Sequence, residues 1–147
     1  MSTAALWAAC ACAVVNLAAA GWGAWRWWTV EASPFFWVLA RTGQAVAVAQ
    51  ALVAGVLFVA GYDPPDGLYW LYALLPVAIG AIAEQLRLLS AEQVLERRAL
   101  ASVEALRARP EAEQRSVVRE IVRREIGVMT VAASVVVFLA LRAALIV

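Results

Sequence analysis

Histidine and lysine are both absent from this chain of 147 residues, and cysteine occurs only twice. The absence of histidine removes the commonest haem and zinc ligand and the commonest general base near neutral pH. Cys10 and Cys12 have one residue between them and lie inside an apolar run. They predict two small buried side chains, and they indicate neither a disulfide framework nor a metal site.

The sequence shows no catalytic constellation. It contains no Ser-His-Asp set, no metal-binding cluster and no phosphate-binding loop, and we therefore favour a non-catalytic protein. The formal net charge is +1, which gives no indication of nucleic-acid binding. All twelve basic residues are arginine, which we attribute to the codon bias of a high-GC bacterial genome.

Apolar residues are abundant, at 65% of the chain, and the mean hydropathy is +0.79. A chain this short cannot bury so much apolar surface in a water-facing core, so we expect lipid to be its solvent. The first apolar run lacks the preceding basic residues of a signal peptide. We predict an all-α, integral membrane four-helix bundle, a single membrane domain over residues 1–147, with spans at about 3–25, 35–60, 68–89 and 127–147.

The distribution of arginine predicts the orientation of these spans. The turn at residues 61–67, "GYDPPDG", has no basic residue, whereas the segment between the third and fourth spans is rich in arginine. The positive-inside rule therefore places the second segment in the cytoplasm and both termini outside, in a multi-pass protein of the cell (inner) membrane. The arginines of this segment are Arg87, Arg97, Arg98, Arg107, Arg109, Arg115, Arg119, Arg123 and Arg124.

We expect the cytoplasmic residues, about 90–126, to form a helical hairpin. Ser90 and Gln93 have the spacing of a capping box, which predicts a helix start. Apolar residues recur over 94–106, and Pro110 suits the first turn of another helix. The hairpin has two interpretations: a solvated connector, or a docking surface for a partner protein or anionic lipid. Its glutamates offset its arginines, which favours a partner protein over anionic lipid as the docked molecule.

A row of small residues marks the second span. These residues are four apart, and such a row lets another helix approach closely. We favour packing within the chain over self-association. The row consists of Gly43, Ala47, Ala51 and Gly55.

Two of the charged residues inside the predicted spans are the most informative. Arg41 and Glu84 are expected at similar depth near the inner surface, where isolated charges are costly, so we predict an ion pair extended by Gln44 and Gln85. Its role is open between a lock on helix register, an arginine that snorkels, and a polar pocket for an anion, a proton or a quinone headgroup. Deeper in the membrane, Asn16 and Gln50 are expected to form interhelical hydrogen bonds.

Aromatic residues gather at the ends of the spans, where tryptophan is enriched at membrane surfaces. We prefer this anchoring role to a pocket for an aromatic ligand. Ser33 and Pro34 fit the cap and first position of the second helix. The predicted interfacial aromatics are Trp22, Trp25, Trp27, Trp28 and Trp37 inside, and Tyr69 and Trp70 outside.

The stretch from Gln44 to Leu75 resembles a pattern in haem A synthase-like and cytochrome b561-like four-helix units. There, a helix with glutamine and a glycine-rich face ends in a short turn with proline, and an aromatic-rich motif follows. Those families ligate haem through histidines, but Tyr69 and Trp70 stand at the corresponding place here, so haem ligation is not implied. The stretches 83–96 and 110–129 also resemble functionally uncharacterised four-helix integral membrane proteins of actinobacteria.

Three functions follow as hypotheses. The first is a non-catalytic accessory or assembly subunit of a larger membrane complex, of which a respiratory complex is one example, with a membrane protein or a second copy as partner. The second is a binder of a hydrophobic cofactor such as quinone, haem or carotenoid, although no particular cofactor is predicted. The third is a small oligomeric transporter or channel. The lipid bilayer is a partner in all three.

Overall fold

The computed structural model describes residues 2–147, and this part of the chain is all-helical, with 84% of its residues in helices and no strands. Four of the helices are long and apolar enough to cross a membrane, which suggests a multi-pass membrane protein. The prediction of an all-α protein with four apolar helices is confirmed. The elements are α1 (Ser2–Thr29), α2 (Pro34–Val59), α3 (Tyr69–Arg97), α4 (Val103–Arg107) and α5 (Glu111–Leu145).

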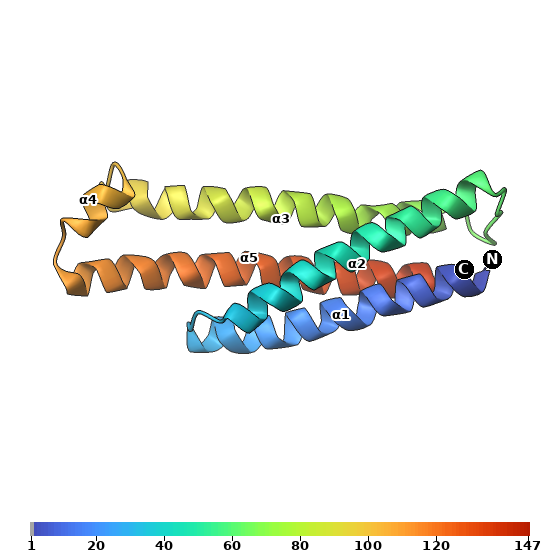
Figure 1. Ribbon diagram of the computed structural model, residues 1–147, viewed down its shortest axis with the longest axis horizontal. Coiled ribbons are helices and arrows are strands. Elements are labelled where there is room, and N and C mark those ends of the chain that lie inside the picture. Colours follow the sequence, from blue (N-terminus) through green and yellow to red (C-terminus); the bar gives the residue numbers. More distant parts are fainter. Residues whose placement is uncertain (1) are drawn as a thin grey trace.

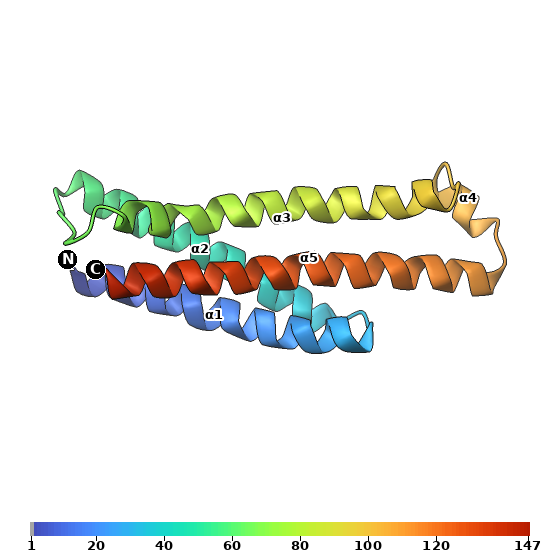
Figure 2. The ribbon, with the colours of Figure 1, turned by 180° about the vertical axis from the view of Figure 1, so that it is seen from behind.

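The four long helices pack so that α1 lies against α2 and α5, and α3 lies against the same two helices. Both termini and the α2–α3 turn lie at one end of the bundle (Figure 1). Seen from behind, α5 lies beside α3 and α1, with α2 on the far side (Figure 2). The bundle therefore has α2 on one face and α5 on the opposite face.

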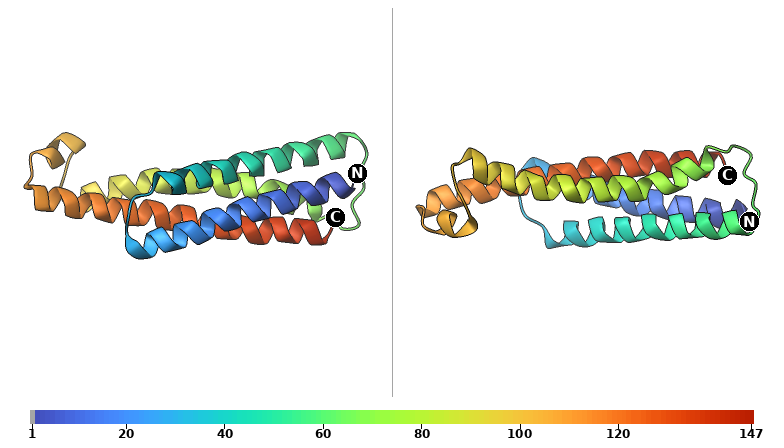
Figure 3. Two further views of the ribbon diagram at one scale, coloured as in Figure 1. Left: turned by 60° about the horizontal axis from the view of Figure 1, so that its bottom comes forward. Right: turned by 90° about the horizontal axis from the view of Figure 1, so that it is seen from above.

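Helices α3 and α5 extend well past the α1–α2 loop and carry the short α4 at their far end (Figure 3). α1 and α2 contain 28 and 26 residues, or about 40 Å each at 1.5 Å per residue. α5 contains 35 residues and is about 52 Å long. Since the hydrocarbon core of a bilayer is about 30 Å thick, a large part of the α3–α5 hairpin would lie outside it.

This hairpin differs from the prediction in its continuity. α3 runs without a break through Ser90, whose hydroxyl donates to the carbonyl of Leu86 at 2.7 Å. The predicted helix start at Ser90 is therefore wrong, because the serine bonds back to the preceding turn instead of capping a new helix. The helix expected over 94–106 is also interrupted, since α3 ends at Arg97 and only α4 follows.

The tip of the hairpin has a small apolar core of its own. Val94 and Val117 are fully buried there, and Leu100 and Leu106 nearly so. These four side chains come from α3, the following loop, α4 and α5, so they hold the tip together. Pro110 stands at the N-cap position of α5, next to the position that the sequence predicts.

Three helices end in the same backbone motif. The residue after each C-cap has a positive φ, at Val30 (53°), Gly61 (76°) and Ala99 (54°). In each case the next amide bonds to a carbonyl five residues back, as in Glu31 N to Arg26 O at 3.3 Å. This is the Schellman arrangement, which prefers glycine at the left-handed position. The sequence provides glycine at one of the three ends, so a turn after α1 or α3 is not signalled by glycine.

The start of α2 agrees with its prediction. Ser33 is the N-cap, its hydroxyl accepts a hydrogen bond from the amide of Phe36, and Pro34 is the first helical residue. The Ser33 hydroxyl also accepts a hydrogen bond from Trp22 Nε1 at 3.1 Å. The cap therefore joins the end of α1 to the start of α2.

Candidate functional site

A network of charged side chains joins α2, α3 and α5 at the end of the bundle nearer the hairpin. Arg41 Nη1 lies 2.6 Å from Glu84 Oε1, and Gln44 Nε2 donates to the same oxygen at 2.9 Å. On the other side of the carboxylate, Arg87 Nε lies 3.1 Å from Glu84 Oε2. Arg87 then reaches α5, with Nη1 3.4 Å from Glu125 Oε1. Three helices that are distant in sequence are thus linked by one chain of ion pairs.

The charges of the network are balanced, and both oxygens of its central carboxylate accept hydrogen bonds. Arg41 and Arg87 face Glu84 and Glu125, so the four formal charges cancel. Glu84 receives hydrogen bonds from three different side chains, which satisfies most of its acceptor capacity. The guanidinium of Arg87 also lies over the ring of Trp37, 5.3 Å from its centroid, within the roughly 6 Å at which a cation–π contact is favourable. A balanced and bonded network of this kind favours fixing the helix register over binding an anion.

The structure brings together three of the four residues of the predicted polar pocket. Arg41, Gln44 and Glu84 are in direct contact, whereas Gln85 is exposed and makes no hydrogen bond to them. The sequence prediction missed Arg87 and Glu125. Arg87 follows Glu84 by three residues, a spacing that places the two on one helix face, but nothing local indicates that Glu125 lies opposite.

The interior beside the network is almost closed. Its cavity has a volume of about 20 Å³ and is lined by residues that include Asn16, Gln44 and Pro76. That volume is close to the space that one water needs. This cavity therefore has no room for a haem, a quinone ring or a carotenoid.

Asn16 and Gln50 differ from each other. Asn16 Nδ2 donates to the carbonyls of Cys12 at 2.9 Å and Gly43 at 3.3 Å, so it links α1 to α2 as predicted. Gln50 is 2% exposed, yet neither polar atom of its side chain has a hydrogen-bond partner among residues 2–147. The interhelical bond expected from Gln50 is absent there.

The row of small residues on α2 is divided between two faces. Gly43 and Ala47 are buried, and a Cβ at Gly43 would lie 2.7 Å from Asn16 Oδ1. Ala51 is partly buried and Gly55 is exposed, with nothing within 4 Å of a Cβ placed there. The row thus packs within the chain over its first half only. Ala54 and Leu57 take over the inward face in its second half.

The outward half of this row lines a groove. The groove has a volume of about 640 Å³ and is lined by residues of α2 and its C-cap, from Ala51 to Ala60. Gly55 lines it without a side chain, together with the exposed Leu52 and Val56. A helix surface of this shape, small residues flanked by aliphatic ones, suits close approach by another membrane helix.

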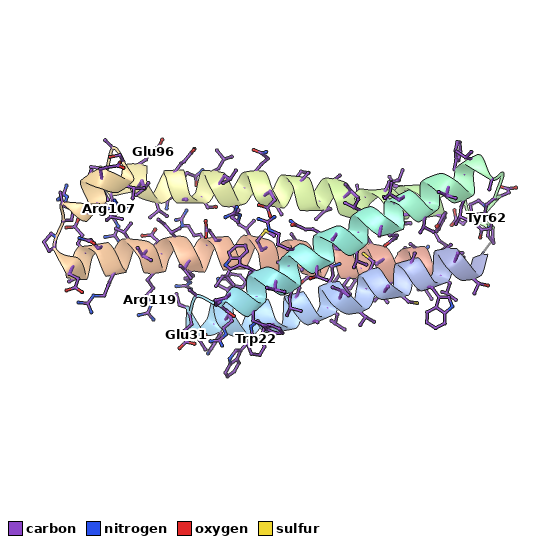
Figure 4. The ribbon with its side chains drawn as sticks, in the orientation of Figure 1. Trp22, Glu31, Tyr62, Glu96, Arg107 and Arg119 are labelled. Carbon is purple, nitrogen blue, oxygen red and sulfur yellow. The ribbon has the colours of Figure 1, made fainter. Side chains whose placement is uncertain are left out.

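The predicted interfacial aromatics lie near the ends of α1, α2 and α3. Trp25 and Trp28 are strongly exposed and Trp27 is partly exposed. Figure 4 shows Trp22 beside Glu31 at the α1–α2 loop and Tyr62 at the opposite end. Tyr69 begins α3, is 1% exposed and packs against the other helices there. Trp70 is partly buried and stacks edge-on against Phe58 at 5.4 Å between ring centroids.

The described residues contain no metal-binding cluster. No group of three or more His, Cys, Asp or Glu among residues 2–147 is placed to hold a metal ion. Cys12 is buried, and Cys10 is partly buried and likewise free. Comparison with protein families, with curated proteins and with solved structures finds no match to this chain.

Proposed function

We propose that this chain is a non-catalytic subunit of a larger membrane assembly, and that the outward groove of α2 binds a transmembrane helix of its partner. The observation that carries the proposal is the exposed Gly55. Glycine inside a helix costs about 1 kcal/mol relative to alanine, and no packing within the described chain uses the space that Gly55 leaves open. A partner helix seated on Ala51 and Gly55 would use it.

The α3–α5 hairpin offers the same assembly a second surface. It is held together by its own core and by ion pairs, among them Arg98 Nη2 to Glu120 Oε2 at 3.2 Å. Figure 4 shows Glu96 and Arg107 at its far end. We propose that the hairpin is cytoplasmic, because it carries most of the arginines, and that both termini lie outside in the inner membrane.

The two other hypotheses have less support. The cavity beside the network is too small for a hydrophobic cofactor, so it gives that hypothesis no support. A transporter or channel would need a polar path, and the neutralised network at Glu84 ends against the packed interior.

The test excises the protein from the membrane with a styrene–maleic acid polymer and measures the particle by native mass spectrometry. We expect a mass above that of one 15.8 kDa chain, from a second protein or a second copy. Gly55→Leu should reduce the particle to a single chain. Gly21→Leu is the matched control, because a Cβ at Gly21 also meets nothing within 4 Å but lies on α1.

A single chain in the wild-type particle would contradict the proposal, and so would equal effects of the two glycine variants. Orientation is tested separately by fusing alkaline phosphatase to the C-terminus, which is active only outside the cytoplasm. An inactive fusion with an active one at residue 102 would reverse the proposed orientation.

A further inference from the structure

A second and larger groove lies between α3 and α5, on the side of the bundle opposite α2. Its volume is about 880 Å³. Figure 2 shows α3 and α5 side by side along this face. Most of its wall is aliphatic, with Ile79, Ile82 and Leu86 from α3 and Val131 and Val135 from α5. Ile82 and Val131 are each more than half exposed, so no side chain of the described chain covers them.

One end of the groove is cationic. Arg123, Arg124 and Glu120 of α5 line it there, together with Ser90 of α3. Arg124 Nη2 lies 3.5 Å from Glu120 Oε1, but the other oxygen of Glu120 is bonded to Arg98. Arg123 has no carboxylate within 4.0 Å among residues 2–147, and its side chain is exposed. Arg98 and Arg124 share the one carboxylate of Glu120 and Arg123 has none within reach in the described chain, which leaves an excess of positive charge at this end.

The cationic end coincides with a membrane-surface marker. Trp27 lines the same end of the groove, and its indole packs against Gly127, where a Cβ would lie 2.9 Å from the ring. Trp27 belongs to the tryptophan-rich end of α1, as expected at the level of lipid headgroups. From Arg124 to Val135 is eleven residues of helix, or about 17 Å, which is close to half of a hydrocarbon core of about 30 Å.

We propose that this groove binds one anionic phospholipid. The phosphate accepts hydrogen bonds from Arg123 and Arg124, and an acyl chain lies between Ile82 and Val131 toward the bilayer midplane. The groove has a positive end at headgroup depth and an aliphatic trough about one leaflet long. An anionic phospholipid matches both features. A partner helix would not need two arginines at the end of its seat. The inference rests on the proposed location in the membrane.

The test is a lipid titration of the detergent-solubilised protein, followed by native mass spectrometry. The probes are phosphatidylglycerol, which is anionic, and phosphatidylcholine, which is not. We expect a retained phosphatidylglycerol adduct, and about tenfold weaker binding in the double variant Arg123→Gln/Arg124→Gln. The control is Arg97→Gln/Arg107→Gln, which removes the same charge from exposed arginines of the same hairpin. This control should bind as the wild type does.

A second pair of variants tests the trough without changing charge. Val131→Trp fills it and should weaken phosphatidylglycerol binding about tenfold. Val14→Trp places the same side chain on an exposed position of α1 and should leave binding unchanged. Inorganic phosphate at millimolar concentration should not displace the lipid, since it cannot occupy the trough.

Three results would each overturn the proposal: equal binding of the two lipids, equal loss in the two arginine pairs, or wild-type binding by Val131→Trp. Resistance of the protein to extraction from membranes by alkaline carbonate is measured in parallel. Release of the protein by alkaline carbonate would reject the membrane location itself. A protein that resists extraction but shows no lipid preference would reject only the lipid site.

Discussion

Arg41 of α2 and Glu84 of α3, 43 residues apart in the chain, form an ion pair with 2.6 Å between Nη1 and Oε1. The two partners are not equivalent. The side chain of Arg41 is 53% exposed, whereas that of Glu84 is 23% exposed and also bonds Arg87 and Gln44. The carboxylate is therefore the centre of the network, and Arg41 is one of its branches.

We predict that Glu84→Gln lowers the free energy of unfolding by about 1–3 kcal/mol, because it leaves two arginines without their shared carboxylate. Arg41→Gln should cost less, since Glu84 keeps Arg87. Glu113→Gln is the control, as its contact with Arg109 is long, at 3.9 Å, and the side chain of Arg109 is 47% exposed. It should change stability by less than about 0.5 kcal/mol. Denaturant titration in detergent, followed by circular dichroism, measures all three, and an equal loss for Glu84→Gln and Glu113→Gln would argue against a central role for Glu84.

The buried amides of α1 and α2 give a second prediction. Gln50→Leu should leave stability unchanged or raise it by about 1–2 kcal/mol, because it removes an amide that has no partner in the described chain. Asn16→Leu should lower stability by about 1–2 kcal/mol, because it breaks the bond to Gly43. Thermal unfolding of both variants in the same detergent is the measurement. A large loss in Gln50→Leu would show that its amide is bonded in the folded protein.

The third prediction concerns the two glycines of the small-residue row. Gly43→Ala should lower stability by about 1–3 kcal/mol, because the new methyl group would meet Asn16 Oδ1 at 2.7 Å. Gly55→Ala should raise the stability of the single chain by up to about 1 kcal/mol, through helix propensity alone. The comparison is made on the isolated chain in detergent, where no partner helix is present. Opposite signs are expected, and a common sign would show that the two glycines face similar surroundings.

The fourth prediction concerns Ala99, the residue after α3 whose backbone has the left-handed conformation. Ala99 has φ 54° and an exposed side chain, so Ala99→Gly should raise stability by about 1 kcal/mol through relief of the backbone strain. Ala101 is also exposed but is not among the residues with positive φ. Ala101→Gly should therefore be neutral or slightly destabilising. The difference between the two melting temperatures is the quantity to measure.

Local sequence patterns predicted the helices, because helix formation depends on residues that are neighbours in the chain. Long apolar runs define α1, α2 and the apolar parts of α3 and α5, and Ser33 with Pro34 marks the start of α2. The prediction at Ser90 failed although the capping pattern is present. A serine within a helix can bond the preceding carbonyl instead, and the helix then continues.

The sequence by itself therefore determined the number of apolar helices and their approximate ends, and it predicted a carboxylate partner for Arg41, since these follow from burial cost and helical periodicity. Only the tertiary structure decided which faces meet. It turned Gly43 inward and Gly55 outward, and it brought Arg87 to Glu125 on α5. The physical reason is that the rotation of a helix about its axis is set by the packing of all its neighbours, and this information is not held in any one segment.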